Sequence, residues 1–464
     1  MINMRKIFLF IVTITLLFTM GCKKFIDVNN DPNSLLDVQE GLILSPVELD
    51  ISSNIAAGNV SIIVNHWMQN VALNQPVPNS GTYLQNNIDF DGDWSNIYVT
   101  GLNNLNILNK KAEANGNLNY AGIAKILTSY CLGVATDLWG DIPYSEAFKG
   151  SDNFTPAYDP QEDIYTALQT LLDNGIEDIG KGEGKAVGSD DYFYGGDMDK
   201  WLTLAYTLKA RYYIHLTKAP GHDAVTQANL ALSALQKGMQ SNDDDLKFDY
   251  PGDAGHENPI YLTFLPVSTL VLSAHLVDGF KTRMDPRLSK MIDPATGTGL
   301  YNGRPIGTAD LGDLNSYSLP GAFYGSPNSA VYIVTYPEAL FIKAEATFLV
   351  SGAAAADPVY KAAVRAHMDL SGISTASADA YIAGRGTLTT ANALNLIMDE
   401  KSIADFLSLE NFNDWRRTGY PVLTKVPNAI SEIPRRVIYS ESEIIANPQP
   451  QQTAKLTDTV WWDK

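Results

Sequence analysis

The stretch DKWLTLAYTLKARYYIHLTK, residues 199–218, decides the fold class of this chain. The apolar residues that recur in it at helical spacing form one stripe: Trp201, Leu204, Ala205, Leu208 and Tyr212. A stripe of this period is typical of a helix with one face in a core. Asp199 lies at the expected start of this helix, where its carboxylate could act as the N-cap acceptor. The sequence therefore predicts a half-buried helix over residues 199–218.

The same reasoning extends this prediction to most of the chain. Thr335 and Glu338 have capping-box spacing, so the hydroxyl can accept from the N3 amide while the carboxylate reaches back. Further helices are expected at residues 94–114, 119–139, 162–179, 224–239, 336–350, 358–370 and 390–409. Small residues such as Ala205 and Ala344 at contact positions suggest tetratricopeptide-like stacking of antiparallel pairs. The spacing between pairs is irregular, so no clean repeat is evident. We expect a mostly α fold.

Four long stretches between these helices lack helical periodicity. They span residues 69–93, 181–198, 243–267 and 292–331, and they are rich in Gly, Pro, Asn and Tyr. Loops of this length inside a folded chain are usually functional or packed as a subdomain. No break in composition cuts the chain, so residues 35–464 are expected to form a single domain with these loops as insertions.

The N-terminal residues indicate where the protein resides. Residues 1–21 have the character of a secretion signal, with Arg5 and Lys6 before an apolar run of 14 residues, 7–20. The run ends at Gly21-Cys22, which resembles the lipobox of bacterial lipoproteins, although Thr19 replaces the usual leucine. The alternative is an ordinary signal peptide with Cys22 left as a free thiol. We expect a lipid on Cys22, residues 22–34 as its tether, and no other inserted segment.

Composition excludes several classes of function. The chain of 464 residues carries a formal charge of −19, which disfavours binding along a nucleic-acid backbone. Two cysteines exclude a disulfide framework, and six scattered histidines form no close ligand pair. Asp91-Gly92-Asp93 resembles part of a calcium loop whose later ligands are absent. Nucleophile-elbow, phosphate-loop and dinucleotide fingerprints are missing as well. The sequence predicts no catalytic residues, no metal and no cofactor beyond the N-terminal lipid.

Four segments in a fixed order carry a family resemblance. They are DLWGDIPYSEA (137–147), YFYGGDMDKW (192–201), TYPEALFIKAE (335–345) and NDWRRTGYP (413–421), the last followed by IPRR (433–436) and WWD (461–463). Together with the lipobox and the Asp31-Pro32-Asn33 turn, they resemble the SusD/RagB family of outer-membrane nutrient-binding lipoproteins. The resemblance covers essentially the whole mature chain and is nearest to the branch that ends in WWD.

This resemblance implies a fold and a role. Four tetratricopeptide-like helix pairs would form a right-handed superhelical scaffold under a loop-rich ligand face. The protein would sit on the cell surface, lipid-anchored in the outer membrane, as a lid over a SusC-like TonB-dependent transporter. It would capture a glycan, or a peptide as in RagB-type members, without catalysis. Two other readings stay open: a surface glycoside hydrolase with an unrecognised carboxylate pair, and a structural tetratricopeptide-repeat lipoprotein.

The signature residues themselves are expected to be scaffold. Trp139, Trp201, Glu338, Trp415 and Arg416 lie on helices or at helix ends. We interpret them as buried aromatics and Arg–carboxylate pairs that fix the exits of loops.

Ligand contacts are expected on two of the loops instead. A sugar ring has an apolar C–H face and a rim of hydroxyls, so it suits aromatic platforms beside short polar side chains. The candidates that offer this mixture are Gln75, Tyr83, Asn86, Asn87, Asp91 and Trp94 in the first loop, and Tyr317, Phe323 and Tyr324 in the second. We expect both loops to face one cavity on the side turned toward the pore. The alternative is that these aromatics pack onto the body, above all Trp94, which opens a helix.

Overall fold

The computed structural model describes residues 38–464. The predicted signal peptide, the lipidation of Cys22 and the tether over residues 22–34 lie outside the described residues. Residues Glu40–Lys464 make one compact unit. No helix in the described part of the chain is long and apolar enough to cross a membrane.

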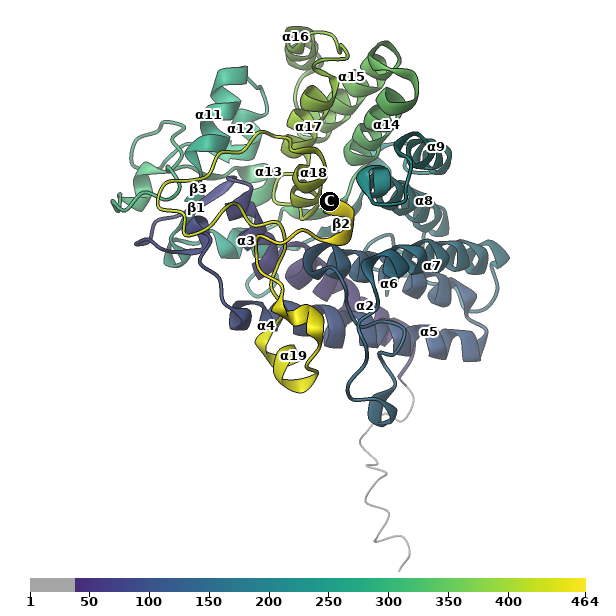
Figure 1. The fold of residues 1–464 in the computed structure, drawn as a ribbon. Coiled ribbons are helices and arrows are strands. Elements are labelled where there is room, and N and C mark those ends of the chain that lie inside the picture. Colours follow the sequence, from purple (N-terminus) through teal and green to yellow (C-terminus); the bar gives the residue numbers. More distant parts are fainter. Residues whose placement is uncertain (1–37) are drawn as a thin grey trace, which may run out of the picture. The chain divides into compact units, whose positions relative to one another are not determined.

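The main helices stack in sequence order, as Figure 1 shows. They are α5 (Asn104–Asn115), α6 (Leu118–Trp139), α7 (Gln161–Lys181), α8 (Met198–His215), α9 (Ala224–Leu235), α14 (Tyr336–Ser351) and α15 (Ala353–Leu370). Each helix in this series packs against the next one. Very short connections between α5 and α6 and between α14 and α15 make those neighbours antiparallel. The tetratricopeptide-like stacking predicted from the sequence is confirmed.

Helix α8 follows from the apolar stripe that predicted it. Four residues of the stripe, Trp201, Leu204, Ala205 and Leu208, are fully buried, and Tyr212 is 2% exposed. The predicted N-cap is wrong by two residues, because the carboxylate of Asp197 accepts from the backbone N–H groups of Asp199 and Lys200. A carboxylate at this position satisfies amides that the first turn leaves without partners.

Helix α14 begins with half of the predicted capping box. The Thr335 hydroxyl accepts from the backbone N–H of Glu338 at 3.2 Å, as expected. The Glu338 carboxylate does not reach back to Thr335, because it binds the guanidinium of Arg211 on α8. The cap residue therefore joins two helices of the stack.

Helices α6 and α7 approach each other closely at two glycines. A Cβ on Gly122 would lie 2.6 Å from Cγ1 of Ile179 and 2.8 Å from the carbonyl oxygen of Gly175. Any larger residue at position 122 would push the helices apart, so the absent side chain sets their spacing.

The N-terminal helices were not predicted. Helix α2 (Gly41–Asp50) continues into a π-helix, η2 (Ile51–Ala56), and is followed by α3 (Asn59–Trp67). The predicted helix at residues 94–114 consists of α4 (Asp91–Ser95), a second π-helix, η5 (Asn96–Asn103), and α5. The two π-helices contact each other. Widened turns of this kind occur often near functional sites.

The long loops fold into short antiparallel pairs on the other side of the stack. β1 (Val71–Leu73) pairs with β3 (Leu270–Leu272), β2 (Leu246–Asp249) with β6 (Ala330–Val334), and β4 (Ile292–Asp293) with β5 (Leu319–Pro320). We call the part that contains β1, β3, β4 and β5 the loop side. Short helices among these strands are α10 (Pro259–Thr263), α11 (Ala274–Arg283), α12 (Leu288–Met291) and α13 (Ala322–Gly325).

The remaining helices complete the body after α15. They are α16 (Thr375–Arg385), α17 (Ala393–Ala404), α18 (Glu410–Thr418) and α19 (Glu441–Ala446). Helix α17 is shorter than the predicted helix at residues 390–409. Single 3₁₀ turns occur at Ser80–Thr82, Asn87–Phe90, Gly150–Asp152, Leu216–Lys218, Asn242–Asp244, Pro266–Ser268, Leu314–Ser316, Pro450–Thr453 and Trp461–Asp463.

The last part of the chain crosses back over the helices, in yellow in Figure 1. We call residues 433–463 the C-terminal strap. The backbone N–H of Val437 donates to Leu138 at 2.9 Å, and Nε1 of Trp139 donates to Ile438 at 3.0 Å. Nε1 of Trp462 donates to the Asp137 carboxylate at 3.0 Å. The strap therefore closes the end of α6.

Candidate ligand-binding site

The signature residues are scaffold, as predicted. Trp139 and Trp201 are fully buried, and Glu338, Trp415 and Arg416 are at most 8% exposed. The Arg416 guanidinium lies over the ring of Trp462, with 4.6 Å from its central carbon to the ring centroid. These contacts hold α18 against the C-terminal strap. The five signature side chains therefore expose little surface to a ligand.

Three of the aromatics predicted to contact ligand are buried. Tyr83 is 1% exposed, Trp94 6% and Tyr324 4%. The Trp94 ring stacks on Tyr98 at a centroid distance of 4.4 Å and meets Trp139 edge-on at 5.0 Å. Their ring faces are occupied by the body, so the expectation of open stacking platforms is corrected at these positions. The reason is their apolar area, which gains more from the core than from a loop surface.

The polar candidates after Tyr83 lie beside the C-terminal strap. The Asn87 side-chain amide donates to the carbonyl oxygen of Tyr439 at 2.6 Å, and an Asp91 carboxylate oxygen accepts from the backbone N–H of Ser442 at 3.0 Å. Asn86 is exposed, and its backbone N–H donates to the Asp89 carboxylate. Asn87 and Asp91 thus bind the protein's own backbone.

The rest of the candidates divide between two places. Gln75 is exposed, and its amide donates to the Thr269 hydroxyl at 2.9 Å beside the β1–β3 pair. Arg304 links this pair to Tyr317, donating to the carbonyl oxygen of Leu73 at 2.9 Å and to the Tyr317 hydroxyl at 3.3 Å. Gln75 and Tyr317 therefore belong to one cluster of loops on the loop side.

Phe323 lies apart from that cluster. Its ring is half-buried and stacks on Tyr332 of β6, with centroids 5.3 Å apart and planes 13° apart. The structure brings Gln75 and Tyr317 near each other, and it places Asn86, Asn87 and Asp91 with the C-terminal strap. A role in binding stays a prediction for the exposed members.

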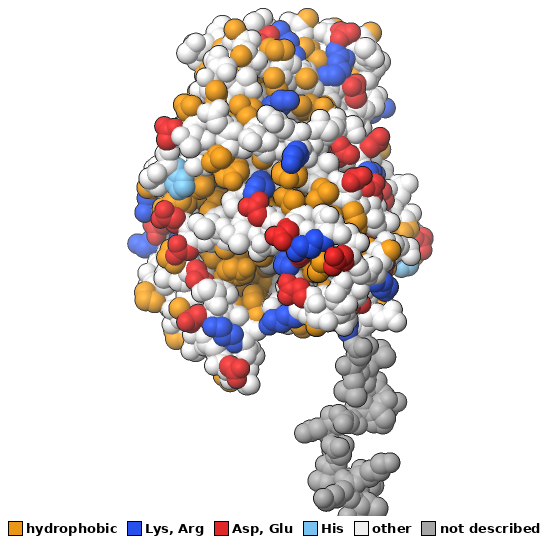
Figure 2. Space-filling model, turned by 90° about the vertical axis from the view of Figure 1, so that its right-hand side faces the viewer, with side chains coloured by type: hydrophobic (Ala, Val, Ile, Leu, Met, Phe, Trp, Pro, Cys, Tyr) orange, Lys and Arg blue, Asp and Glu red, His pale blue; other side chains and the backbone are white. Residues whose placement is uncertain are grey.

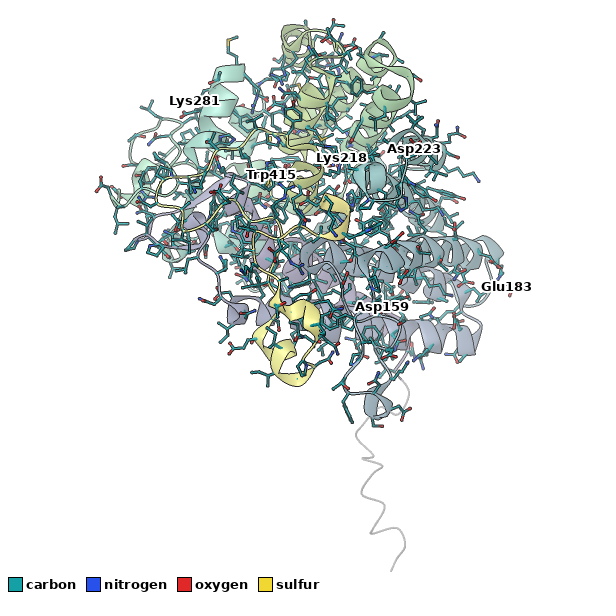
Figure 3. All side chains as sticks on the ribbon, viewed as in Figure 1. Asp159, Glu183, Lys218, Asp223, Lys281 and Trp415 are labelled. Carbon is teal, nitrogen blue, oxygen red and sulfur yellow. The ribbon has the colours of Figure 1, made fainter. Side chains whose placement is uncertain are left out.

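The hollow with the greatest volume that we describe lies between α11 and α16. It has about 690 Å³ and is lined by Arg283, Met284, Pro286, Tyr381 and Arg385, among others. A second hollow of about 260 Å³ shares Arg283 with it and extends to Asn70, His275, Asp399, Asn411 and Val422. We call the two together the Arg283 groove. In Figure 3, Lys281 marks α11 and Trp415 marks α18, two of the helices that contribute to it.

The groove contains a chain of ion pairs. Nη1 of Arg283 lies 3.3 Å from one Asp399 oxygen, and Arg385 binds the other. Nε of Arg385 lies 2.8 Å from Glu400. Desolvation lowers the pKa of Arg385, but the negative charges of Glu400 and Asp399, together with Tyr381 and Tyr360, outweigh it and raise the pKa of this guanidinium. Fixed charges of both signs can donate to and accept from a neutral polar ligand.

The part of the groove lined by His275, Met284 and Val422 carries less charge. Desolvation, and then the positive charge of Arg283, lower the pKa of His275, so the imidazole is neutral at pH 7. Met284 is 85% exposed and Val422 is 64% exposed, which supplies apolar contact area at the rim. Met284 also has a positive φ of 52°, a conformation that bulky residues rarely adopt.

Sequence reasoning did not single out this groove. One signal was available in Arg283-Met284-Asp285-Pro286, a charged turn with a large apolar residue at its tip. The groove combines that turn with helices more than 90 positions further along the chain, as in the contact of Arg287 with Tyr381. Among residues 38–464, no group of three or more His, Cys, Asp or Glu side chains is arranged to hold a metal ion.

Antiparallel helix pairs stacked in sequence order define a tetratricopeptide-like helical protein. Residues 32–440 match a family model described as SusD-like, starch-binding and associating with the outer membrane. The chain belongs to this SusD-like family. Its members are binding proteins associated with the outer membrane. Curated proteins give no match to this sequence.

Solved structures share the fold over nearly the whole chain. A chitin-binding protein is 26% identical, with a TM-score of 0.79, and covers 92% of this chain and 100% of its own. A SusD/RagB family protein of Bacteroides thetaiotaomicron is 24% identical, with a TM-score of 0.79 and coverage of 92% and 99%. A chitin-binding SusD homologue from Flavobacterium johnsoniae is also 24% identical, with a TM-score of 0.79 and coverage of 92% and 98%.

Proposed function

We propose that this protein is a non-catalytic glycan-binding lipoprotein of the cell surface, which delivers its ligand to a SusC-like TonB-dependent transporter. The family match over residues 32–440 carries this proposal. The 26% identical chitin-binding protein supports a glycan as the ligand class. The lipid on Cys22 would tether the protein to the outer membrane beside the transporter.

The Arg283 groove is the place that we assign to the glycan. Its volume suits a ligand of several sugar units, since small-molecule sites commonly have about 300–1,000 Å³. Arg283 and Asp399 can exchange hydrogen bonds with ring hydroxyls, and Met284 and Val422 can cover an apolar sugar face. A neutral glycan also avoids repulsion by a chain with a charge of −19.

Calorimetric titration of the purified protein with N-acetylglucosamine hexamer and with maltoheptaose tests the assignment. Arg283→Gln and Met284→Ala should each weaken binding about fivefold to tenfold, because each loses one hydrogen-bonding group or one apolar contact. Lys425→Gln, which breaks an exposed ion pair with Glu432, is the matched control and should bind like the wild type.

Wild-type affinity in both groove variants would place the ligand elsewhere. Binding of peptides with no binding of any glycan would overturn the ligand class. For the anchor, metabolic labelling with a fatty acid should mark the wild type and not Cys22→Ala; equal labelling would contradict the lipoprotein assignment.

A further inference from the structure

We propose that a second saccharide-binding site lies on the helical stack, in a hollow of about 310 Å³ between α7, the end of α8 and Trp461. We call it the Trp461 groove. It shares no lining residue with the Arg283 groove. Trp461 also lies beyond residues 32–440, so the family match does not assign this site.

The two neighbouring tryptophans of the C-terminal strap have different environments. Trp462 is fully buried, donates to Asp137 and lies under Arg416, so the core explains it. Trp461 is half-buried, and its indole N–H makes no hydrogen bond with a described residue. The ring contacts His222 edge-on at a centroid distance of 5.6 Å and Tyr165 at 6.3 Å. An indole held this way offers an apolar surface at the rim of a polar hollow.

Two glutamines that line the hollow, Gln169 and Gln227, each have a buried amide oxygen without a described donor. Nε2 of Gln169 donates to the carbonyl oxygen of Lys209 at 3.2 Å, which fixes the amide because a carbonyl can only accept. Oε1 of Gln169 is then buried with no partner among the described residues. A buried acceptor without a partner costs free energy until a donor reaches it.

Gln227 on α9 repeats this arrangement. It is 7% exposed, and its Nε2 lies 2.9 Å from Nδ1 of His222, while Oε1 has no partner in the described part of the chain. Were the amide turned over, its nitrogen would be left unpaired instead, so one end of Gln227 is free in either orientation. In Figure 3, Asp223 marks the adjoining start of α9.

The threonines of α7 add to the same polarity. The Thr166 hydroxyl donates to the Glu162 carbonyl at 3.2 Å, and the Thr170 hydroxyl donates to the Thr166 carbonyl at 3.0 Å. Because each hydroxyl already donates its only proton, its oxygen can only accept a further hydrogen bond. Figure 2 views the side of the body where α7 and α9 lie, and hydrophobic side chains there show between charged ones.

An acceptor-rich hollow with one flat apolar wall fits a saccharide ring. Ring hydroxyls supply many donors, and the C–H face can pack on the indole. Anions are disfavoured by Glu162, which lines the hollow. A cation is the competing occupant, but Asp173 is already paired with Lys209, with 2.5 Å between their charged atoms. Two binding sites on one protein would keep a long glycan nearby after it has dissociated from one of them.

The test reads the indole N–H resonance of Trp461 in ¹⁵N-tryptophan-labelled protein, assigned with Trp461→Phe. Titration with maltoheptaose or N-acetylglucosamine hexamer should move this resonance saturably, and it should do so equally in Arg283→Gln. Gln169→Met and Gln227→Met keep the side-chain length and should each weaken that saturation about fivefold. Gln236→Met, at an exposed position outside the hollow, is the matched control.

Three results would overturn the second site. The Trp461 resonance could stay in place with both neutral glycans, it could move only with a simple amine such as glucosamine, or the two Gln variants could saturate like the wild type. Because the readout belongs to Trp461 and the Arg283→Gln background is included, failure of the Arg283 groove and failure of this site are distinguishable.

Discussion

Arg211 in the helical stack and Arg304 on the loop side are both buried, but they have different partners. Arg211 of α8 is 5% exposed and binds the Glu338 carboxylate through two bonds of 2.7 and 2.6 Å. Arg304 on the loop side is 2% exposed and binds the carbonyl oxygens of Leu73, Thr308 and Asp310, together with the Tyr317 hydroxyl. No described carboxylate pairs with Arg304.

The difference follows from where backbone carbonyls are free. Inside a helix each carbonyl already accepts from an N–H four residues on, so few backbone acceptors are free for a buried cation such as Arg211. Irregular loops leave carbonyls unpaired, and one guanidinium with its five N–H groups can satisfy several of them. At Arg211 an ion pair thus joins α8 to α14, whereas neutral acceptors from the loops surround Arg304.

Two buried histidines repeat the contrast. Nε2 of His215 in α8 lies 2.7 Å from the Glu410 carboxylate. Nδ1 of His66 in α3, next to the loop side, lies 3.2 Å from the carbonyl oxygen of Val71. The helical stack therefore holds this histidine with a charged partner, and the loop side holds the other with backbone.

Arg211→Met should give the largest loss of stability, because it leaves Glu338 buried without its partner. Removing one partner of a buried ion pair costs about 3–5 kcal/mol. Urea unfolding followed by circular dichroism measures the change. The double variant Arg211→Met/Glu338→Leu should recover much of the loss, since no unpaired charge remains. A loss below about 1 kcal/mol in the single variant would show that the pair is not held tightly.

Arg304→Met should cost less, about 1–3 kcal/mol, since it leaves neutral carbonyls that water can reach. Tyr317→Phe, which removes one of the arginine's partners, should cost about 1 kcal/mol or less. Both are measured by the same unfolding curves. If Arg304→Met destabilised as much as Arg211→Met, the distinction between the two sides would fail.

A further prediction concerns acid stability through His66. Burial, opposed by the bond to Val71, lowers the pKa of His66 to about 4, against about 6.5 in the unfolded chain. As pH falls, the unfolded chain therefore takes up this proton first. The stability that neutral His66 contributes is present above pH 6.5 and is lost as pH falls toward 4. Between pH 7.5 and 5 the loss is about 2 kcal/mol.

His66→Asn isolates this contribution from other titrating groups. The difference in unfolding free energy between wild type and variant should shrink by about 2 kcal/mol from pH 7.5 to pH 5. A difference that stays constant over this range would mean that His66 titrates alike in both states.

Local pattern in the sequence predicted the helices whose apolar stripe is regular. Helices α6, α8 and α14 follow from periodicity within each segment, whereas α15 was predicted only from residue 358 although it begins at Ala353. Helix α2 was missed because it contains Pro46 and its buried residues include Glu48 and Asp50, so no clean stripe is visible. Helix α18 was missed because most of its buried residues are polar or charged, and Phe412 and Trp415 alone form no longer apolar stripe.

The candidate site was less predictable because it depends on distant parts of the chain. Whether Tyr83 or Tyr324 faces water is set by how far-separated loops pack, which single-sequence periodicity does not encode. Trp461 and Trp462 were recognised as a motif, but the neighbouring sequence does not show that Trp462 is buried and Trp461 only half-buried. No sequence motif contains both Arg283 and Asp399, so their ion pair was not predicted.

The C-terminal strap also sets the order in which the protein can mature. Trp139 meets its partner Ile438 across 299 positions of sequence. During synthesis, Trp139 at the end of α6 therefore cannot form this hydrogen bond until almost all of the described chain has been made. Until then the body is an incomplete intermediate with an open flank, the state that chaperones hold and proteases cut.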